Sequence, residues 1–117
     1  MQIENIQKRI DKIKADLQLI GDMRPGSVSE QYTKCGRDGC RCQDPKNQKL
    51  HGPYNHLRYV HRGKSTTQFI QKLQLGSIKR QLATYKKFRL LTEEWVNLAL
   101  DLSLEKLRIE KETIRKK

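Results

Sequence analysis

Isoleucine and leucine recur at intervals of three and four residues along the first twenty positions of the chain. The apolar positions are Ile3, Ile6, Ile10, Ile13, Leu17 and Ile20, and most residues between them are polar or charged. This spacing places all six side chains on one face of a helix. The pattern predicts an N-terminal helix over residues 1–22 that packs against another helix through its apolar face.

Apolar and polar residues alternate instead in the middle of the chain, which is typical of short β-strands. The strands are expected at residues 28–33, 54–61 and 65–70. Arg62-Gly63-Lys64 separates the last two and predicts a hairpin turn. The expected head, over residues 27–71, is a β-hairpin or a three-stranded antiparallel sheet. A sheet this small is marginally stable in water, so a further interaction must hold it together.

From residue 76 to the end the chain again has helical spacing, with no proline and no glycine after Gly76. One apolar row consists of Phe88, Leu91, Trp95, Leu98 and Leu102, and a second, on roughly the opposite face, of Leu100, Leu104, Leu107 and Ile114. A helix over residues 76–117 would be about 60 Å long, roughly twice the N-terminal helix. Because the first helix cannot cover both rows, we expect a homodimer whose helices form a bundle. A monomer with a bent or frayed C-terminal end is the alternative.

These elements predict an α+β fold and one domain overall. Its expected parts are an N-terminal helix, a small antiparallel β head and a long C-terminal helix. Only 35% of the residues are apolar and 32% are charged. A composition of this kind suits helices that bury one stripe and a small sheet that needs a staple.

Three cysteines lie in the turn-rich segment after the first expected strand, in the pattern C-x4-C-x-C. Zinc prefers four ligands drawn from thiolates and imidazoles. Gly36 and Gly39 allow a tight turn, whereas Cys40 and Cys42 can share an ion only if the chain turns at Arg41. The predicted zinc ligands are Cys35, Cys40, Cys42 and His51. The bound ion would stabilise a head that lacks a large core.

Alternatives to this metal site remain open. His56 or His61 could replace His51 as the fourth ligand. The thiols could also be reduced structural cysteines, or redox or nucleophilic groups. If protein fills all four ligand positions, no position is left for a catalytic water. We therefore expect no enzymatic activity, and no catalytic residue is assigned.

The positive charge of the chain is concentrated in its middle. The net charge is +12, yet residues 1–33 and residues 90–117 are each neutral. Residues 34–89 contain fourteen basic residues against two acidic ones, which accounts for the whole excess. Positive charge gathered in one part of a chain is typical of a surface that binds a polyanion.

The residues expected to contact nucleic acid are Lys34, Arg37, Arg41, Arg58, Arg62, Lys64, Lys79, Arg80, Lys86 and Lys87. Arginines in the loop and hairpin can contact phosphates or guanine in bidentate fashion, whereas the helix lysines would contact phosphates. Tyr54 and Tyr59 could stack on unpaired bases, which keeps RNA and single-stranded DNA open beside the favoured duplex DNA. For Tyr59, packing against Leu57 in the small core is the stronger interpretation.

Several short motifs together resemble a family of small uncharacterised prokaryotic proteins. They are Met23-Arg-Pro-Gly-Ser-Val-Ser-Glu-Gln-Tyr32, Cys35-Gly-x3-Cys-x-Cys42, His51-Gly-Pro-Tyr54, Gly63-Lys-Ser-Thr-Thr67 and Leu91-Thr-Glu-Glu-Trp95. The resemblance covers roughly residues 23–100. Some members of that family lie near transposases, which suggests a mobile-element context. The resemblance implies no established activity and transfers no catalytic residue.

No stretch approaches the ~18 apolar residues that span a bilayer, and no signal-peptide pattern follows Met1. We therefore expect a cytoplasmic protein without a membrane partner or a small-molecule substrate. The favoured function is that of a small, basic, zinc-stabilised nucleic-acid-binding protein, which uses its zinc head and the start of its C-terminal helix. The alternative is a coiled-coil interaction module that docks an acidic partner protein.

Overall fold

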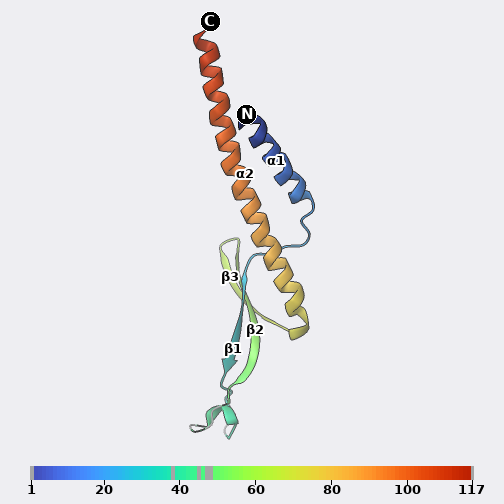
Figure 1. Ribbon diagram of the computed structural model, residues 1–117. Helices are drawn as coiled ribbons and strands as arrows, with labels where there is room; N and C mark the ends of the chain where they lie inside the picture. The colour runs from blue at the N-terminus through green and yellow to red at the C-terminus, as the bar shows by residue number, and fades with distance from the viewer. Residues whose placement is uncertain (1, 38, 45, 47–48, 117) are drawn as a thin grey trace. The chain divides into compact units, whose positions relative to one another are not determined.

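The computed structural model of the protein describes residues 2–37, 39–44, 46 and 49–116. Its elements in chain order are α1 (Gln2–Gln18), β1 (Ser27–Thr33), the 3-10 turn η1 (Arg41–Gln43), β2 (His51–His61), β3 (Lys64–Ile70), the 3-10 turn η2 (Lys72–Gln74) and α2 (Leu75–Arg115) (Figure 1). The predicted α+β fold, with a helix at each end and a small antiparallel sheet between them, is confirmed.

The chain divides into two compact units. The helical unit consists of Met1–Asp22 and Thr84–Lys117, and the head consists of Met23–Ala83. The long helix α2 runs through both units, so its first turns belong to the head and the rest to the helical unit. Within the described part of the chain, neither α1 nor α2 has an apolar stretch long enough to cross a bilayer.

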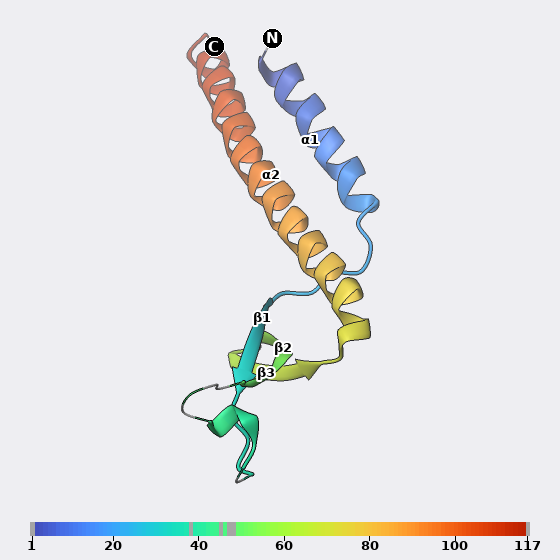
Figure 2. The same cartoon turned by 60° about the horizontal axis from the view of Figure 1, so that its bottom comes forward.

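In the helical unit, α1 lies antiparallel beside α2, as Figure 2 shows. The predicted stripe on α1 forms this contact, since Ile10 and Ile13 are buried. The predicted apolar row on α2, from Phe88 to Leu102, is half-buried. Arg9 donates two hydrogen bonds to Glu94, at 2.7 and 3.1 Å, and Lys14 lies 5.3 Å from the centre of the Trp95 ring. Because the Arg9–Glu94 pair is exposed, it defines the alignment of the helices more than it stabilises them.

Helix α1 ends at Gln18, four residues before the predicted end at residue 22. The N–H groups of Leu19 and Ile20 donate to carbonyls three residues back, at 3.1 and 3.2 Å. Hydrogen bonds of this i to i−3 type tighten the last turn and end the helix.

The three strands pair in the order β1-β2-β3, and both pairs are antiparallel. Arg62 and Gly63, which have positive φ values of 51° and 76°, form the two-residue turn between β2 and β3. Strand β2 begins at His51, three residues before the predicted start, so Gly52 and Pro53 belong to the strand and do not precede it. Leu57 and Ile70 are buried on one face of this sheet.

The buried face of the sheet contacts Arg24, which lies just before β1 in the chain. The guanidinium of Arg24 lies 4.9 Å from the centre of the half-buried Tyr59 ring. The backbone N–H of Arg24 donates a hydrogen bond to the backbone carbonyl of Gln81 on α2 at 3.2 Å. A capping box between Gln71 and Gln74 precedes α2 and supplies hydrogen bonds at the start of the helical run. The sheet of the head therefore packs against the rest of the head through one face, the face that includes Tyr59.

Candidate metal centre

The pairing of β1 with β2 brings the two ends of the cysteine-containing loop together. Thr33, the last residue of β1, pairs with His51, the first residue of β2. Cys35 follows Thr33 by two residues and therefore lies close to His51. The remaining two cysteines are on η1: Cys40 precedes this turn and Cys42 lies within it. A sheet end and a single turn of 3-10 helix thus position all four predicted ligands.

The predicted ligand set comes together in the structure. The Sγ atoms of Cys35, Cys40 and Cys42 and a ring nitrogen of His51 all lie within 4.8 Å of one another. The Sγ atoms of Cys35 and Cys42 are 3.5 Å apart, and Cys40 Sγ is 3.1 Å from His51 Nε2. Tetrahedral zinc with Zn–S bonds of ~2.3 Å needs sulfur atoms about 3.8 Å apart. These four residues are close enough to hold a metal ion of that geometry.

The turn at Arg41 that the metal site requires is present. Residues Arg41–Gln43 form η1, in which the N–H of Gln43 donates to the Cys40 carbonyl at 3.0 Å. The N–H of Lys49 returns to the Arg41 carbonyl at 3.0 Å, which closes the loop on the turn. Cys42 and Cys40 consequently face the same centre, although a strand would have turned them apart.

The surroundings of the thiols set their ionisation. A hydrogen bond from the backbone of Cys42, and then bonds from the Cys35 and Cys42 side chains, lower the pKa of Cys40 to about 6. Cys40 is therefore largely a thiolate at neutral pH, the form that binds metal. Burial raises the pKa of Cys42, whose sulfur accepts a hydrogen bond from the Cys35 N–H at 3.3 Å. A cation at this centre would stabilise the additional thiolates.

The two alternative histidine ligands lie elsewhere on β2. His56 has its ring against that of Phe69, with a centroid distance of 6.3 Å, and His61 pairs with Lys64 next to the hairpin turn. Neither belongs to the group of potential metal ligands among the described residues, which consists of Cys35, Cys40, Cys42 and His51. The prediction of His51 over His56 and His61 as the histidine near the cysteines is confirmed.

A pocket of about 400 Å³ opens beside the cysteine cluster. Its walls are formed by Thr33, Cys35, Gly36, Arg37, Cys40, His51 and Tyr54. Arg37 is the one predicted basic contact among these residues, and Tyr54 adds a phenol ring. The pocket thus offers a cation and an aromatic edge next to the candidate metal centre.

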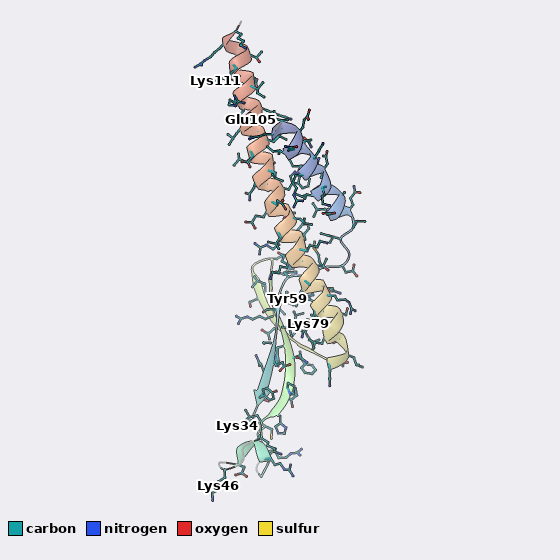
Figure 3. All side chains as sticks on the ribbon, viewed as in Figure 1. Lys34, Lys46, Tyr59, Lys79, Glu105 and Lys111 are labelled. Carbon is teal, nitrogen blue, oxygen red and sulfur yellow. The ribbon has the colours of Figure 1, made fainter. Side chains whose placement is uncertain are left out.

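The predicted basic contacts do not gather into one patch. Lys34, Arg37 and Arg41 lie at the metal end of the sheet, and Figure 3 shows Lys34 there (Figure 3). Arg62 and Lys64 lie at the hairpin turn, the opposite end of β2. Arg58 is on β2, and Lys79 and Arg80 are on the first turns of α2. Lys86 and Lys87 are two turns further along α2 and belong to the helical unit, so the structure does not place them against the head.

The sequence analysis did not identify His56 and Phe69 as part of a shared aromatic face. His56 was considered only as a metal ligand, and Phe69 only as part of a strand. Both lie on the same sheet face as Tyr54, because His56 pairs with Phe69 and is two residues from Tyr54. The signal in the sequence is the alternation of residues 54, 56 and 58, but it identifies a shared face with Phe69 only once the strand register is known.

The comparisons with known proteins agree with the resemblance stated above at the level of the family. A family model described as a domain of unknown function, DUF6788, matches residues 3–80. Neither the curated proteins nor the solved structures gave a significant match. The family match covers more than half of the chain and includes α1, the whole sheet and all four candidate metal ligands. The chain therefore belongs to the DUF6788 family, a domain of unknown function.

Proposed function

We propose that this protein binds nucleic acid through its head and that a zinc ion holds the head together. The observation that carries the proposal is that six basic side chains of the head are exposed and form no ion pair with any described residue. They are Lys34, Arg37, Arg41, Arg58, Arg62 and Lys64. In the helical unit, two of the basic residues, Arg9 and Arg108, pair with glutamates. The unpaired positive charge favours a polyanionic partner.

The chemistry of the ligand set supports zinc as the ion. Three thiolates and one imidazole are a common closed set for structural zinc, whereas magnesium and calcium prefer oxygen ligands. Few side chains of the described head are buried, chiefly Leu57, Ile70, Cys42 and Asn55. A core this small needs a further source of stability, and a bound ion supplies it.

DNA is the proposed partner ahead of RNA. The arginines of the loop and turn suit phosphates and guanine edges in the major groove of duplex DNA. Arg37 and Arg41 flank the metal centre, and Arg62 is exposed in the turn at the tip of the hairpin. These residues would bind from the two ends of the sheet, while Lys79 and Arg80 would add phosphate contacts from α2.

Salt titration of DNA binding, together with the double substitution Arg41→Ala and Arg62→Ala, tests the proposal. Each phosphate neutralised contributes about −0.9 to the slope of log affinity against log salt concentration. We expect the double variant to bind more weakly and to lower the magnitude of the slope by about 2. Its metal content and circular dichroism should match the unsubstituted protein, because both side chains are exposed.

Lys8→Ala with Lys12→Ala is the matched control, since it removes two exposed positive charges from α1. This control should leave the slope unchanged. Binding that is absent at low salt, or equally weakened by both double variants, would contradict a nucleic-acid surface on the head.

A second candidate function, protein–protein interaction, is favoured by the far end of α2. Leu104 and Leu107 are 57% and 56% exposed, and Leu100 and Ile114 are exposed beside them. The alignment of Arg9 with Glu94 places the start of α1 near Asp101, so α1 does not extend along this part of α2. Leu100, Leu104, Leu107, Lys111 and Ile114 recur at spacings of four and three, which is typical of a coiled-coil seam.

We propose a second copy of the chain, antiparallel to the first, as the occupant of this seam. The flanking residues alternate in charge, and residues 90–117 are neutral overall, which suits self-association better than binding of an acidic partner. In a parallel pair Lys111 would face Lys111 of the other copy. In an antiparallel pair centred between Leu104 and Leu107, Lys111 would instead lie near Asp101 of the other copy, an attractive arrangement.

The double substitution Leu104→Lys and Leu107→Lys is expected to convert a dimer into a monomer in sedimentation experiments. Burying a leucine stabilises an interface by about 1.5–3 kcal/mol, so the loss of two per chain should weaken association at least about 100-fold. Ile109→Lys with Thr113→Lys, on the other side of α2, is the matched control and should remain dimeric. A monomeric unsubstituted protein, or equal effects of the two double variants, would rule out this seam.

A further inference from the structure

The two faces of the sheet differ sharply in what covers them. Leu57, Ile70 and Asn55 are buried on one face. On the other, which we call the open face, Phe69 is 56% exposed and Tyr54 is 37% exposed. The strand register assigns to the open face Ser27, Ser29, Gln31, Tyr54, His56, Arg58, Val60, Ser65, Thr67 and Phe69. Large apolar rings are thus left accessible on a sheet whose other face is packed.

Three rings form a connected group on the open face. The ring centroids of Tyr54 and Phe69 are 6.2 Å apart, and those of His56 and Phe69 are 6.3 Å apart, both in edge-to-face arrangement. Phe69 lies between the other two and belongs to the neighbouring strand. The β1 residues that share this face are small or polar, Ser27, Ser29 and Gln31, so no bulky side chain of β1 covers the rings.

The charge of the open face is positive only. Arg58 lies two residues from His56 on the same side of β2. The single carboxylate of β1, Glu30, pairs with Asn55 and therefore lies on the opposite face. Tyr54 also lines the pocket that contains Arg37, so the aromatic group continues toward the metal end of the sheet. Aromatic rings, a cation at each end and no carboxylate are the features expected of a surface that binds unpaired bases.

We propose that the open face binds single-stranded nucleic acid, with unpaired bases stacked on Phe69, Tyr54 and His56 and the sugar–phosphate backbone held by Arg58 and Arg37. This inference rests on the proposed function and specifies the ligand class for the same head. A duplex cannot use these rings, because its bases are already stacked on one another, whereas every unpaired base offers a face for stacking. The open face therefore distinguishes single-stranded from duplex nucleic acid, and it has little preference for base sequence.

Phe69→Ala tests the proposal, with a dT oligonucleotide and a random duplex of the same length as probes. Loss of one stacking ring is expected to weaken binding of the single strand roughly 5- to 150-fold and to leave duplex binding unchanged. Phe69→Trp should retain binding, whereas Phe69→Leu, which keeps an apolar side chain, should lose it. Ultraviolet cross-linking of a bromodeoxyuridine oligonucleotide should map to Tyr54 or Phe69.

Leu73→Ala is the matched control, because Leu73 is 96% exposed on η2 and lies outside the open face. It removes an exposed apolar side chain and should leave both affinities unchanged. Phe69 is itself exposed, so metal content and thermal stability of its variants should equal those of the unsubstituted protein.

Each other outcome overturns the inference in a distinguishable way. Duplex binding without single-strand binding, or single-strand binding that Phe69→Ala leaves intact, removes the stacking surface but keeps the proposed function. Absence of salt-sensitive binding to both probes removes both. If Phe69→Ala instead dissociates a dimer in the absence of nucleic acid, the open face is an interface between copies of the chain and does not bind bases.

Discussion

Cys40→Ser is expected to abolish metal binding and to unfold the head while the helical unit keeps its helices. The three remaining ligands cannot close a four-coordinate site, and the described head buries few side chains that could replace the ion. In zinc-finger peptides, structural zinc contributes about 10 kcal/mol or more, which is comparable to the whole stability of a small domain. Metal analysis should fall from about one zinc per chain to none, and limited proteolysis should cleave within residues 23–70.

Two histidine variants provide the matched comparison for this prediction. His51→Asn removes a candidate ligand, whereas His61→Asn changes an exposed histidine of the same strand that lies outside the cluster. The first should behave like Cys40→Ser and the second like the unsubstituted protein. A Cys40→Ser protein that retains one zinc per chain would show that the four residues are not the ligand set. A stable sheet after removal of the ion by a chelator would show that the metal is not the staple.

Gly52→Ala is expected to destabilise the head and to weaken its affinity for metal. Gly52 has φ +140°, and a Cβ atom there would lie 2.7 Å from the Gln31 carbonyl oxygen and 3.1 Å from the ring of Tyr32. Backbone strain of this kind costs about 1–3 kcal/mol, and the contact with a backbone oxygen adds to it. Because Gly52 follows His51, separation of β1 from β2 would also move a ligand.

Gly36→Ala is the control for this substitution. A Cβ atom at Gly36 meets nothing within 4 Å, although the residue follows a ligand just as Gly52 does. The free energy of unfolding from urea titration and competition with a zinc chelator should separate the two variants. Equal losses in both would mean that the effect comes from the loop in general and not from the close approach of β2 to β1.

Much of the fold could be predicted from the sequence because its elements are periodic. The isoleucine stripe of α1 and the row from Phe88 to Leu102 on α2 each give a helix one apolar face, and two such faces are expected to pack together. The cysteine pattern predicted the three sulfur ligands and the required turn at Arg41, whereas His51 was only favoured over His56 and His61, which the sequence left open as alternatives. In each case a geometric requirement could be stated before the structure was known, and the structure meets it.

The features that could not be predicted depend on the register of the paired strands and on which residues lie at each end of the sheet. The shared face of Phe69 and His56 follows from the pairing of β2 with β3, which no single strand specifies. The distribution of basic residues depends on the same information. Arg41 and Arg62 seemed equivalent in a list of charges, yet β2 places them at opposite ends of the sheet. The early end of α1 arises from local hydrogen bonds at Leu19 and Ile20, and helix ends are poorly specified by periodicity.

The pairing of Thr33 with His51 has a consequence for how relatives of this chain can differ in length. Because both ends of the intervening loop are anchored by a strand pair, inserted residues between Asp44 and Lys49 would lengthen a segment whose sequence contains no cysteine, histidine or carboxylate. The entropic penalty of such growth is small, about 0.6 kcal/mol for each doubling of loop length. The interval from Cys40 to Cys42 has no such freedom, since the turn η1 sets the separation of these two thiols. Length variation within the family should therefore concentrate after Cys42, and the spacing of Cys40 and Cys42 should stay constant.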